Sequence, residues 1–496
     1  MAVKESQKPL EPIVFLLLVL TLALFLVRLY AARVIGFGDS EALYATYAKF
    51  PQPAYLDHPG LVGVLASSLG AGTIPSPAAA HVATAALASA FPWLVVVVAR
   101  QLGAPMRPAA IAGLVVAATP EIGVGLYAMT PDLLLSFLWL AFIGLCSAAL
   151  EAEPKGGRSA ALFLATGVIA GAAATAKITG VLLFPAMGIV VWLDAKHRRA
   201  PWPWLGIAAG LVPVARIALF ESRRGWPMLH HRLVDTQHAA GFSFRNVGAL
   251  FGGQLLYLSP VIAVVAAIVA WRLVRARREA GLLFWTFALP IVPLAILCLW
   301  SRVAEPHWLA PPLLALPLFA ATHAEPYRRK LVAPAVGVGL AFVVAVHAWV
   351  LSPSLLRYAP ASYDAKVDIT NELYGWPDAT RAVGEMLQDA DAAAGVRLDG
   401  WVVGATWMTC AQLQAGSPSA KVGCATDVPS DFDDWAPPAT TWKRADVIVF
   451  VSTDGRPPPA SLSAFHLART ERVSVVRGGR IVRTFHLTLL EKLAAG

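Results

Sequence analysis

Ionisable side chains are dense in the polar stretch 36–60, GFGDSEALYATYAKFPQPAYLDHPG, which follows the first long apolar run of the chain. Asp39 or Glu41 could act there as a general base that takes a proton from an acceptor hydroxyl at the water–lipid boundary. The structural alternative is that Asp39 caps a short helix over 40–50 and that Glu41 favours the positive end of this helix. The two assignments are compatible. Tyr44 belongs to an aromatic stripe on the same helix, which we expect to lie in the membrane interface.

An acid and an imidazole, Asp57 and His58, stand side by side before Pro59 at the end of this stretch. Such a pair can bind a metal or orient a sugar hydroxyl, although polar interfacial loops commonly contain both residue types. A divalent metal would use Asp39, Glu41 and His58. The sequence indicates no certain cofactor and leaves the need for a metal open.

Two isolated charges lie at the borders of later apolar segments. Asp132 follows Thr130 and Pro131, and an acid in the first turn of a helix is ordinary architecture. Lys177 lies in TATAKITGVLLF with apolar residues on both sides. A lysine there is costly unless it snorkels or faces a polar cavity. A cavity that binds a phosphate would satisfy it, so we favour a functional role over snorkelling.

Further candidates come from two segments on the same side of the membrane. Glu305 and His307 open an apolar segment and can line a cavity or lie at the interface beside a tryptophan. The segment 221–251 is rich in cations, which suit a phosphate group through paired guanidinium contacts. A solvated loop that touches lipid head groups would have the same composition. The cations retained as candidates are Arg223, Arg224, His230 and Arg245.

Motifs for several other chemistries are missing from the sequence. It has no P-loop, GxSxG or HExxH pattern in a usable context, so ATP-driven transport and hydrolysis by those motifs are unsupported. The formal net charge of +9 could indicate nucleic acid. We interpret it as the charge of cytoplasmic loops and expect no nucleic-acid partner.

The composition is that of a membrane protein, because 57% of the 496 residues are hydrophobic and only 14% are charged. The first apolar run lacks a clear cleavage site, so we interpret it as a retained helix. Apolar runs long enough to cross a bilayer predict about eleven spans. We place them at 12–33, 79–99, 108–127, 131–150, 159–176, 178–194, 203–220, 252–271, 283–300, 307–323 and 332–351.

The distribution of basic residues predicts the orientation. With a cytoplasmic N-terminus, the 34–78 and 221–251 connections are external and the tail from 352 is external as well, since the number of spans is odd. The densest basic clusters then fall in cytoplasmic connections, as the positive-inside rule requires. These connections are 100–107, 151–158, 196–199, 272–278 and 325–330.

The tail differs from the rest of the chain, because its hydropathy drops and both charge signs appear. It indicates a small α/β domain with its own core. Cys410 and Cys424 can pair in an oxidising compartment or remain lone core residues. The predicted elements of the tail are a helix, two buried strands and a final edge strand, at 378–394, 400–405, 445–452 and 480–490.

Six segments between 36 and 316 occur in a characteristic order, and they are DSEALY, YLDHPG, TPDLLLSFLW, AKITGVLLFP, GFSFRNVGALFGGQLLYLSP and EPHWLAPPLLAL. This ordered set resembles the membrane-embedded GT-C glycosyltransferases, in particular glycosyltransferase family 39, which includes protein O-mannosyltransferases and aminoarabinose lipid A transferases. The chain departs from the family pattern at Ser40, which separates two acids that are usually adjacent, and at Gly60, which replaces a second proline.

The resemblance implies a mostly helical, polytopic transmembrane domain over 1–351, whose first external loop, 34–78, is catalytic, and an extracytoplasmic α/β domain over 352–496. It implies a hexosyl or pentosyl transferase of the bacterial inner membrane. The donor is a polyprenyl-phosphate-linked sugar and not a nucleotide sugar, and the acceptor is a lipid, a glycan or a protein. A single displacement would invert the anomeric configuration.

The resemblance also implies roles for the candidates. Asp39 becomes the base, with Glu41 as the alternative because of the inserted serine. The sugar and acceptor side is lined by Asp57, His58 and Asp132, and the departing phosphate is stabilised by Lys177 and the loop arginines. Two other functions stay open at this point, namely a polyprenyl-lipid flippase and a catalytically inactive accessory homologue.

Overall fold

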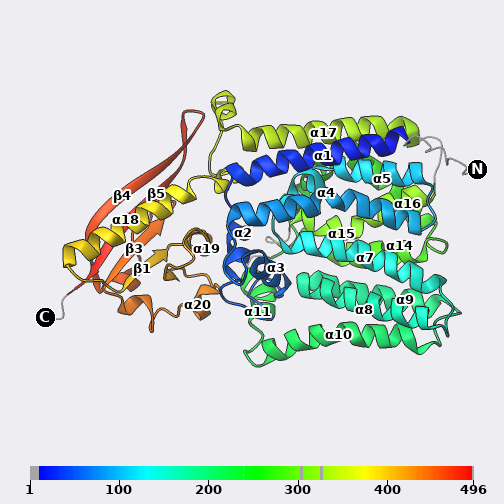
Figure 1. Ribbon diagram of the computed structural model, residues 1–496, viewed down its shortest axis with the longest axis horizontal. Helices are drawn as coiled ribbons and strands as arrows, with labels where there is room; N and C mark the ends of the chain where they lie inside the picture. The colour runs from blue at the N-terminus through cyan, green and yellow to red at the C-terminus, as the bar shows by residue number, and fades with distance from the viewer. Residues whose placement is uncertain (1–10, 238–239, 302–304, 324–327, 494–496) are drawn as a thin grey trace, which may run out of the picture.

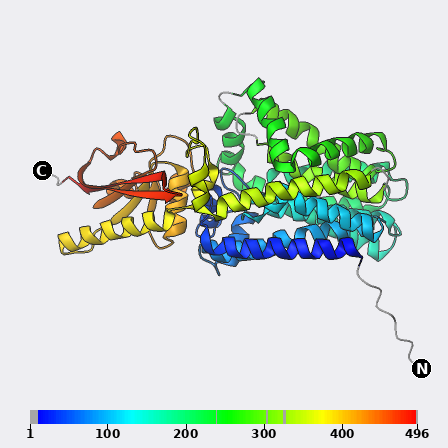
Figure 2. The same ribbon diagram turned by 90° about the horizontal axis from the view of Figure 1, so that it is seen from above.

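The computed structural model describes residues 11–237, 240–301, 305–323 and 328–493. Figure 1 shows a bundle of long helices and, beyond one end of it, a smaller part built around a sheet. The first helix, α1 (Pro12–Val34), begins at the far end of the bundle and finishes next to the smaller part. The same arrangement is visible from above in Figure 2.

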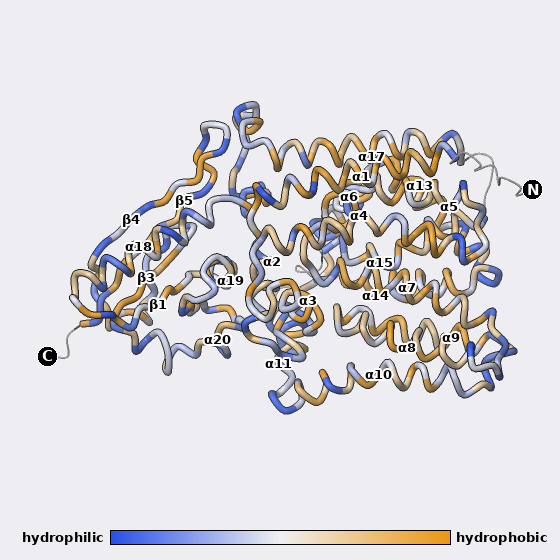
Figure 3. Tube along the Cα trace, in the orientation of Figure 1, coloured by the Kyte–Doolittle hydropathy of each residue, from blue (hydrophilic) through white to orange (hydrophobic). Residues whose placement is uncertain are grey.

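Within the described residues, seven helices are long and apolar enough to cross a membrane. Four of them begin with proline, which fits the first turn of a helix because its missing N–H would have no intrahelical partner there. Figure 3 shows apolar residues along these helices and polar residues at their ends and in the smaller part. The seven are α1, α4 (Pro77–Gln101), α7 (Pro131–Glu151), α8 (Gly157–Ala176), α10 (Pro201–Ser222), α14 (Gly281–Trp300) and α17 (Arg328–Leu351).

Two further expected spans are bent pairs of helices. The first, α5 (Met106–Ala118) followed by α6 (Pro120–Gly123) and η1 (Gly125–Tyr127), bends by 72°. The second, α12 (Phe244–Leu258) and α13 (Pro260–Arg275), bends by 105°. The continuous helix expected over 252–271 is therefore wrong, because a residue that precedes proline is driven out of the helical region.

The last two expected spans are short or interrupted. Residues 178–193 form η2 (Ile178–Leu182) and α9 (Leu183–Leu193), and 306–322 form η4 (Pro306–Leu309), α15 (Ala310–Leu313) and α16 (Ala315–Thr322). An apolar run of this length is compatible with a helix buried among others. All eleven expected segments are thus helical, although fewer are continuous spans. Residues 302–304 and 324–327, which belong to two expected connections, lie outside the described residues.

Close helix packing in the bundle depends on glycine. A Cβ atom added at Gly167 of α8 would lie 1.8 Å from the carbonyl oxygen of Gly206 in α10, and one at Gly210 would lie 2.0 Å from the carbonyl oxygen of Gly167. Small residues at helix crossings let two backbones approach each other in a membrane, where packing replaces the hydrophobic effect as the driving force.

The smaller part contains a five-stranded sheet of order β2-β1-β3-β5-β4. Strand β1 pairs in parallel with β2 and β3, and β5 pairs antiparallel with β3 and β4. Its helices are α18 (Trp376–Ala394), α19 (Trp407–Gly416) and the short α20 (Phe432–Trp435). Its strands are β1 (Gly400–Gly404), β2 (Val422–Cys424), β3 (Val447–Ser452), β4 (Phe465–Arg477) and β5 (Arg480–Lys492).

The predicted helix and two buried strands of the tail are present, but the last strand is not at the edge. Strand β5 lies inside the sheet, and β4 takes the edge beside it. The two strands are joined by Gly478 and Gly479, both with positive φ (56° and 81°), as a tight hairpin turn requires. The charged, largely exposed sequence of β4 gave no apolar alternation from which to predict a strand.

The first external loop is packed between the bundle and the sheet. Its helix α2 (Asp39–Thr46) shares one hydrophobic cluster with α18, α19 and the strands, which includes Tyr47, Trp376 and Phe485. The N–H of Gly36 donates to the carbonyl of Leu373, at 2.9 Å. Helix α2 is therefore buried against protein, contrary to the expected place in the membrane interface. Its N-cap is Gly38, so the expectation that Asp39 caps it is wrong.

A buried arginine fastens the sheet to the end of α17. The Arg477 guanidinium, in β4, donates to the carbonyl of Trp349, at 2.9 Å, and to the side chain of Asn371, at 2.5 Å. Asn371 belongs to η6 (Ile369–Leu373), the segment that also contacts the first external loop. The end of α17, the loop and the sheet are therefore held as one unit.

Candidate functional site

A buried ion pair between Asp132 and Lys177 is the centre of the candidate site. Asp132 is in the first turn of α7, where the Thr130 hydroxyl caps the helix by accepting from the N–H of Leu133. Lys177 is an extended residue between α8 and η2. Its Nζ lies 2.8 and 2.9 Å from the two carboxylate oxygens of Asp132. Only 3% of Lys177 is exposed, so its charge is satisfied inside the protein and does not snorkel.

The segment that carries Glu305 and His307 surrounds this pair. His307 Nε2 lies 3.7 Å from Asp132 Oδ2, and its Nδ1 lies 3.0 Å from Glu305 Oε2. The Trp308 ring faces Lys177, with Nζ 5.1 Å from the ring centroid. The expected set Asp132, Lys177, Glu305 and His307 is therefore brought together in one cluster, called here the lysine cluster.

His58 faces the lysine cluster from the first external loop. Burial lowers its pKa well below the usual value, and the positive charges of Lys177 and Arg232 lower it further, so the imidazole is neutral. Within the described residues its Nδ1 has no hydrogen-bond partner. The Tyr44 ring packs against it at a centroid distance of 5.6 Å. A buried neutral imidazole with a free nitrogen is suited to a hydrogen bond with a substrate hydroxyl.

Gly60 explains one departure from the family pattern. A Cβ atom at this position would lie 2.3 Å from the carbonyl oxygen of Gln52 and 3.0 Å from that of Pro53. The N–H of Gly60 donates to the Pro53 carbonyl, at 2.9 Å. A proline at position 60 would clash with these carbonyl oxygens and would have no N–H to donate to Pro53. The loop that presents His58 therefore could not adopt this conformation with a second proline.

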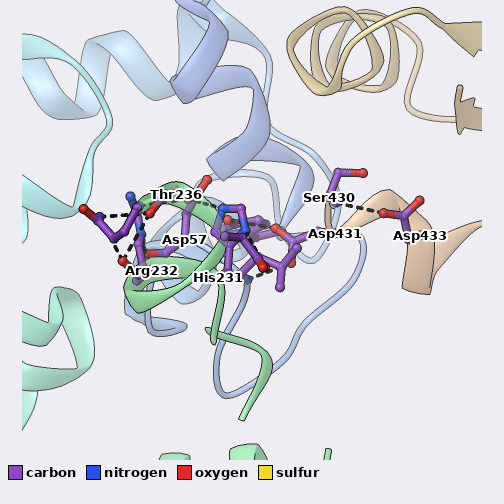
Figure 4. Close-up of polar contacts among 11 residues, drawn as sticks. Asp57, His231, Arg232, Thr236, Ser430, Asp431 and Asp433 are labelled. Carbon is purple, nitrogen blue, oxygen red and sulfur yellow. Dashed lines mark hydrogen bonds and ion pairs between the residues drawn. The ribbon is translucent and has the colours of Figure 1, made fainter. Parts of the chain in front are cut away.

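Asp57 is bound from the 221–251 segment. The Arg232 guanidinium, in α11 (Pro227–Leu233), lies 2.9 Å from Asp57 Oδ1 and also donates to the Asp57 carbonyl, at 3.1 Å. His231 Nε2 lies 3.8 Å from the same carboxylate oxygen. Figure 4 shows these side chains converging on the loop. In the described part of this segment, Arg232 and His231 are the cations that contact Asp57, the neighbour of His58.

Asp431 approaches the same loop from the C-terminal part, as Figure 4 also shows. Its carboxylate accepts from the N–H of Leu56, at 2.9 Å, and from the Tyr47 hydroxyl, at 3.3 Å. Burial raises its pKa to about 7, with a further contribution from the negative charge of Asp57. The C-terminal part thus fixes the backbone immediately before Asp57.

Both carboxylate oxygens of Glu41 are occupied by contacts within the protein. Its carboxylate accepts from the N–H of Met129, at 2.7 Å, and from the N–H of Gly38, at 3.1 Å. His81 Nε2 lies 3.2 Å from Oε1. Burial opposes ionisation, but the His81 charge and these hydrogen bonds outweigh it and lower the pKa of Glu41. With 6% of the residue exposed, Glu41 joins the loop to the segment between η1 and α7 and to α4.

Asp39 points instead toward the C-terminal part. Its Oδ1 accepts from the side-chain amide of Gln412, at 2.9 Å, and its N–H donates to Glu372, at 3.3 Å. Burial raises the pKa of Asp39, while Gln412 and Arg483 oppose the rise. The pKa of Glu372 is raised to about 7 by burial and by the charge of Asp39, and Glu305 adds to it. Glu372 is therefore within electrostatic range of both Asp39 and the lysine cluster.

In the described part of the chain, none of the remaining predicted cations forms an ion pair with the lysine cluster. Arg223 is exposed after α10, and Arg224 contacts Gln52, at 3.2 Å, and Asp434. His230 lies 3.2 Å from Asp235. Arg245 lines a small pocket of about 280 Å³ at the start of α12, and the lining of this pocket includes Pro306, which lies between Glu305 and His307 of the lysine cluster. In the described part of the chain no group of three or more His, Cys, Asp or Glu side chains is arranged to hold a metal ion.

An apolar cavity of about 1060 Å³ lies in the helix bundle and is lined by residues of α1, α5, α13, α15, α16 and α17. Glu121 and Thr119 are part of its lining, as is Arg107 at the start of α5. Glu121 interacts electrostatically with Asp132, Lys177 and Glu305. The cavity therefore extends from the vicinity of the lysine cluster through the apolar interior of the bundle.

Sequence reasoning missed several of these residues. Glu121 had a usable signal, because a lone acid in an apolar segment is a functional candidate. Gln412, Glu372 and Asp431 had none, since they are ordinary polar residues of the tail that become relevant only through contact with the first loop. Cys410 and Cys424, whose state the sequence left open, are joined by a disulfide.

The model of the dolichyl-phosphate-mannose-protein mannosyltransferase family matches residues 73–219. No curated protein is significantly similar to the chain in sequence. Among solved structures, the chain is similar to ArnT from Cupriavidus metallidurans bound to undecaprenyl phosphate. The TM-score is 0.62 at 16% sequence identity, over 96% of this chain and 98% of that one.

The apo state of the same ArnT gives a TM-score of 0.60 at 16% identity, over 95% of this chain and 97% of that one. The chain is also similar to the Archaeoglobus fulgidus oligosaccharyltransferase tethered with an acceptor peptide. That TM-score is 0.50 at 11% identity, over 88% and 69% of the two chains. These likenesses concern the fold and confirm the resemblance that the ordered sequence segments predicted.

Proposed function

We propose that this chain, a multi-pass membrane protein with the GT-C glycosyltransferase fold, transfers a sugar from a polyprenyl-phosphate donor to an acceptor on the outer face of the membrane. The observation that carries the proposal is the apolar cavity whose lining residue Glu121 interacts with the Asp132–Lys177 pair. A donor of this kind has a long apolar chain and a charged head, and it needs these two environments next to each other.

Lys177 is suited to bind the phosphate of the donor. An ammonium group has three N–H donors, and in the described residues Asp132 accepts from Lys177 through two contacts. The phosphate would approach the remaining donor, with His307 close by. A cation fixed where negative charge develops stabilises the departing phosphate, and it does so most strongly in a site with little water.

Asp39 is the better candidate for the base. Both oxygens of Glu41 are occupied by backbone N–H groups and His81. In the described part of the chain, by contrast, no hydrogen bond reaches the Oδ2 atom of Asp39. Asp39 would take the proton of the acceptor hydroxyl while the acceptor oxygen bonds to the anomeric carbon. The bond from that carbon to the phosphate oxygen breaks, and the lipid phosphate leaves with the electron pair, so the configuration inverts.

The neutral side chain of His58 and the Asp57–Arg232 pair would line the sugar between these two groups. His58 offers its free Nδ1 to a sugar hydroxyl. The proposed acceptors are a lipid, a glycan or a protein, and the proposed orientation follows the basic clusters, with the loop and the C-terminal part outside. Because α1 and α17 both end beside the sheet, the first loop and the tail share one side of the membrane.

The test uses purified protein in lipid nanodiscs, a radiolabelled polyprenyl-phosphate sugar and an extract of envelope lipids and glycans. We expect label to move to an acceptor, with inversion at the anomeric carbon by NMR, and Asp39→Asn to abolish the transfer. The matched control is Asp427→Asn, an exposed acid of the tail. Translocation of labelled donor without transfer, unaffected by Asp39→Asn, would support the flippase instead. Absence of both activities would support an inactive accessory homologue.

A further inference from the structure

We infer that Gln412, in the C-terminal part, is a positioning residue that orients the Asp39 carboxylate toward the acceptor. The inference rests on the proposed function, because it takes Asp39 as the base. The Nε2 atom of Gln412 donates two hydrogen bonds, to the carbonyl of Phe37, at 2.8 Å, and to Asp39 Oδ1, at 2.9 Å. One amide therefore holds both the backbone before the base and one of its two oxygens.

This contact is built into the core of the protein. Gln412 is 3% exposed, and it lies in α19, which packs directly on α2 within one hydrophobic cluster. The first half of the helix is anchored, because Thr406 caps its start and the Cys410–Cys424 disulfide joins it to β2. A buried side chain on an anchored helix has little freedom, so its amide is fixed before any substrate binds.

The orientation matters because it decides which oxygen is available. With Oδ1 held by Gln412, Oδ2 is left to receive the proton. The other charged groups that face Asp39 are Glu372, which accepts from its N–H, and Arg483 of β5. Glu305 of the lysine cluster faces Glu372 in turn. Without Gln412, the carboxylate would be free to turn toward Arg483 and away from the acceptor.

A second glutamine on the same helix provides a matched control. Gln414 is equally buried, and its amide donates to the backbone carbonyls of Ser417, Pro418 and Ala420, without contact to Asp39. Removal of either amide deletes buried hydrogen bonds from α19. Of the two, only removal of the Gln412 amide also deletes a hydrogen bond to Asp39, the proposed base.

The experiment compares Gln412→Met, which keeps the length of the side chain but has no donor, with Gln414→Met. We expect Gln412→Met to lower kcat roughly 10- to 100-fold, the range that misplacement of a catalytic group produces. The KM for the lipid donor stays within about twofold, because the donor is bound at Lys177. Gln414→Met changes neither constant by more than about twofold. Hydrogen exchange of a peptide over 36–46 becomes faster in Gln412→Met alone.

Equal kcat values in Gln412→Met and Gln414→Met, with equal exchange in the 36–46 peptide, would overturn the inference. If Gln412→Met fails to fold by size-exclusion chromatography, Gln412→Glu takes its place, since it keeps the length but places a negative charge beside Asp39. A wild-type protein that transfers no sugar would contradict the proposed function. The exchange comparison would still decide whether Gln412 orders the Asp39 segment.

Discussion

The ammonium of Lys177 lies within 3 Å of both carboxylate oxygens of Asp132, at 2.8 and 2.9 Å, although the two residues are 45 positions apart. Each residue alone had an ordinary explanation, as a first-turn acid of a helix or as a snorkelling lysine. Because Lys177 contacts Asp132 inside the protein, it does not snorkel. The contact also joins α7 to the break between α8 and η2. His307 and His58 lie close to the ion pair at this point.

Removal of one partner of this pair should destabilise the protein strongly. We expect Lys177→Met to lower the free energy of unfolding by about 3 kcal/mol, the lower end for a buried pair, because the Asp132 side chain is 22% exposed and keeps His307 at 3.7 Å. Thermal unfolding in detergent measures the loss. The control is Lys421→Met, which breaks an exposed pair with Asp399 and should cost less than about 1 kcal/mol. The double variant Lys177→Met with Asp132→Leu should recover part of the lost stability, and a failure to recover would argue against the pair.

Asp431 should lower the stability of the protein as the pH rises toward 7, while His58, whose pKa is depressed, acts in the opposite direction over this range. Its pKa is about 7 in the folded protein and 3.8 in an ordinary environment. Between these values the unfolded chain releases the proton and the folded chain keeps it, so rising pH favours unfolding. One such group contributes a slope of about 1.4 kcal/mol per pH unit.

Asp431→Asn is neutral at every pH and tests this directly. We expect its unfolding temperature to exceed that of the wild type at pH 8 and to match it at pH 4. Part of the pH dependence should survive through Glu372, whose pKa is also about 7. A wild-type protein whose stability relative to Asp431→Asn rises from pH 5 to pH 8 would contradict the direction of the Asp431 shift.

Gly60→Ala should disturb the loop that presents His58. The new Cβ would lie 2.3 Å from the Gln52 carbonyl oxygen, which is a backbone atom and cannot rotate away. We expect a loss of about 1–3 kcal/mol in the free energy of unfolding, together with a higher KM for the donor. Gly248→Ala, on α12, is the control, because no atom lies within 4 Å of its added Cβ. Equal behaviour of the two variants would show that the loop adapts.

Glu41 and Asp39 should respond differently to loss of charge. Glu41→Gln places an amide N–H against backbone donors and should lower the free energy of unfolding by about 1–3 kcal/mol. Asp39→Asn should leave the unfolding temperature within a few degrees of the wild type and lower kcat roughly 100- to 10,000-fold. Measured on the same preparations, melting curves and turnover separate the two roles. The reverse pattern would make Glu41 the base.

Much of the architecture was predictable from local sequence. The cost of placing a residue in lipid depends mainly on its type, so each of the eleven apolar runs corresponds to a helical segment of the bundle, whereas α3 (Leu61–Leu69) was not predicted. Apolar periodicity likewise predicted α18, β1 and β3. These predictions failed at Thr119 and at Ser259, where a following proline bends the chain, and at β5, where a charged neighbouring strand covers the expected edge.

The sequence alone determined that this chain is a membrane-embedded helical bundle with an α/β tail, and it named most of the side chains in the lysine cluster. Only the tertiary structure decided that both oxygens of Glu41 accept hydrogen bonds, whereas in the described part of the chain no hydrogen bond reaches Oδ2 of Asp39. It did so through residues such as Gln412, which is 373 positions from Asp39. Composition and periodicity are properties of neighbouring residues, whereas the surroundings of a carboxylate depend on which distant segments the packed core brings against it.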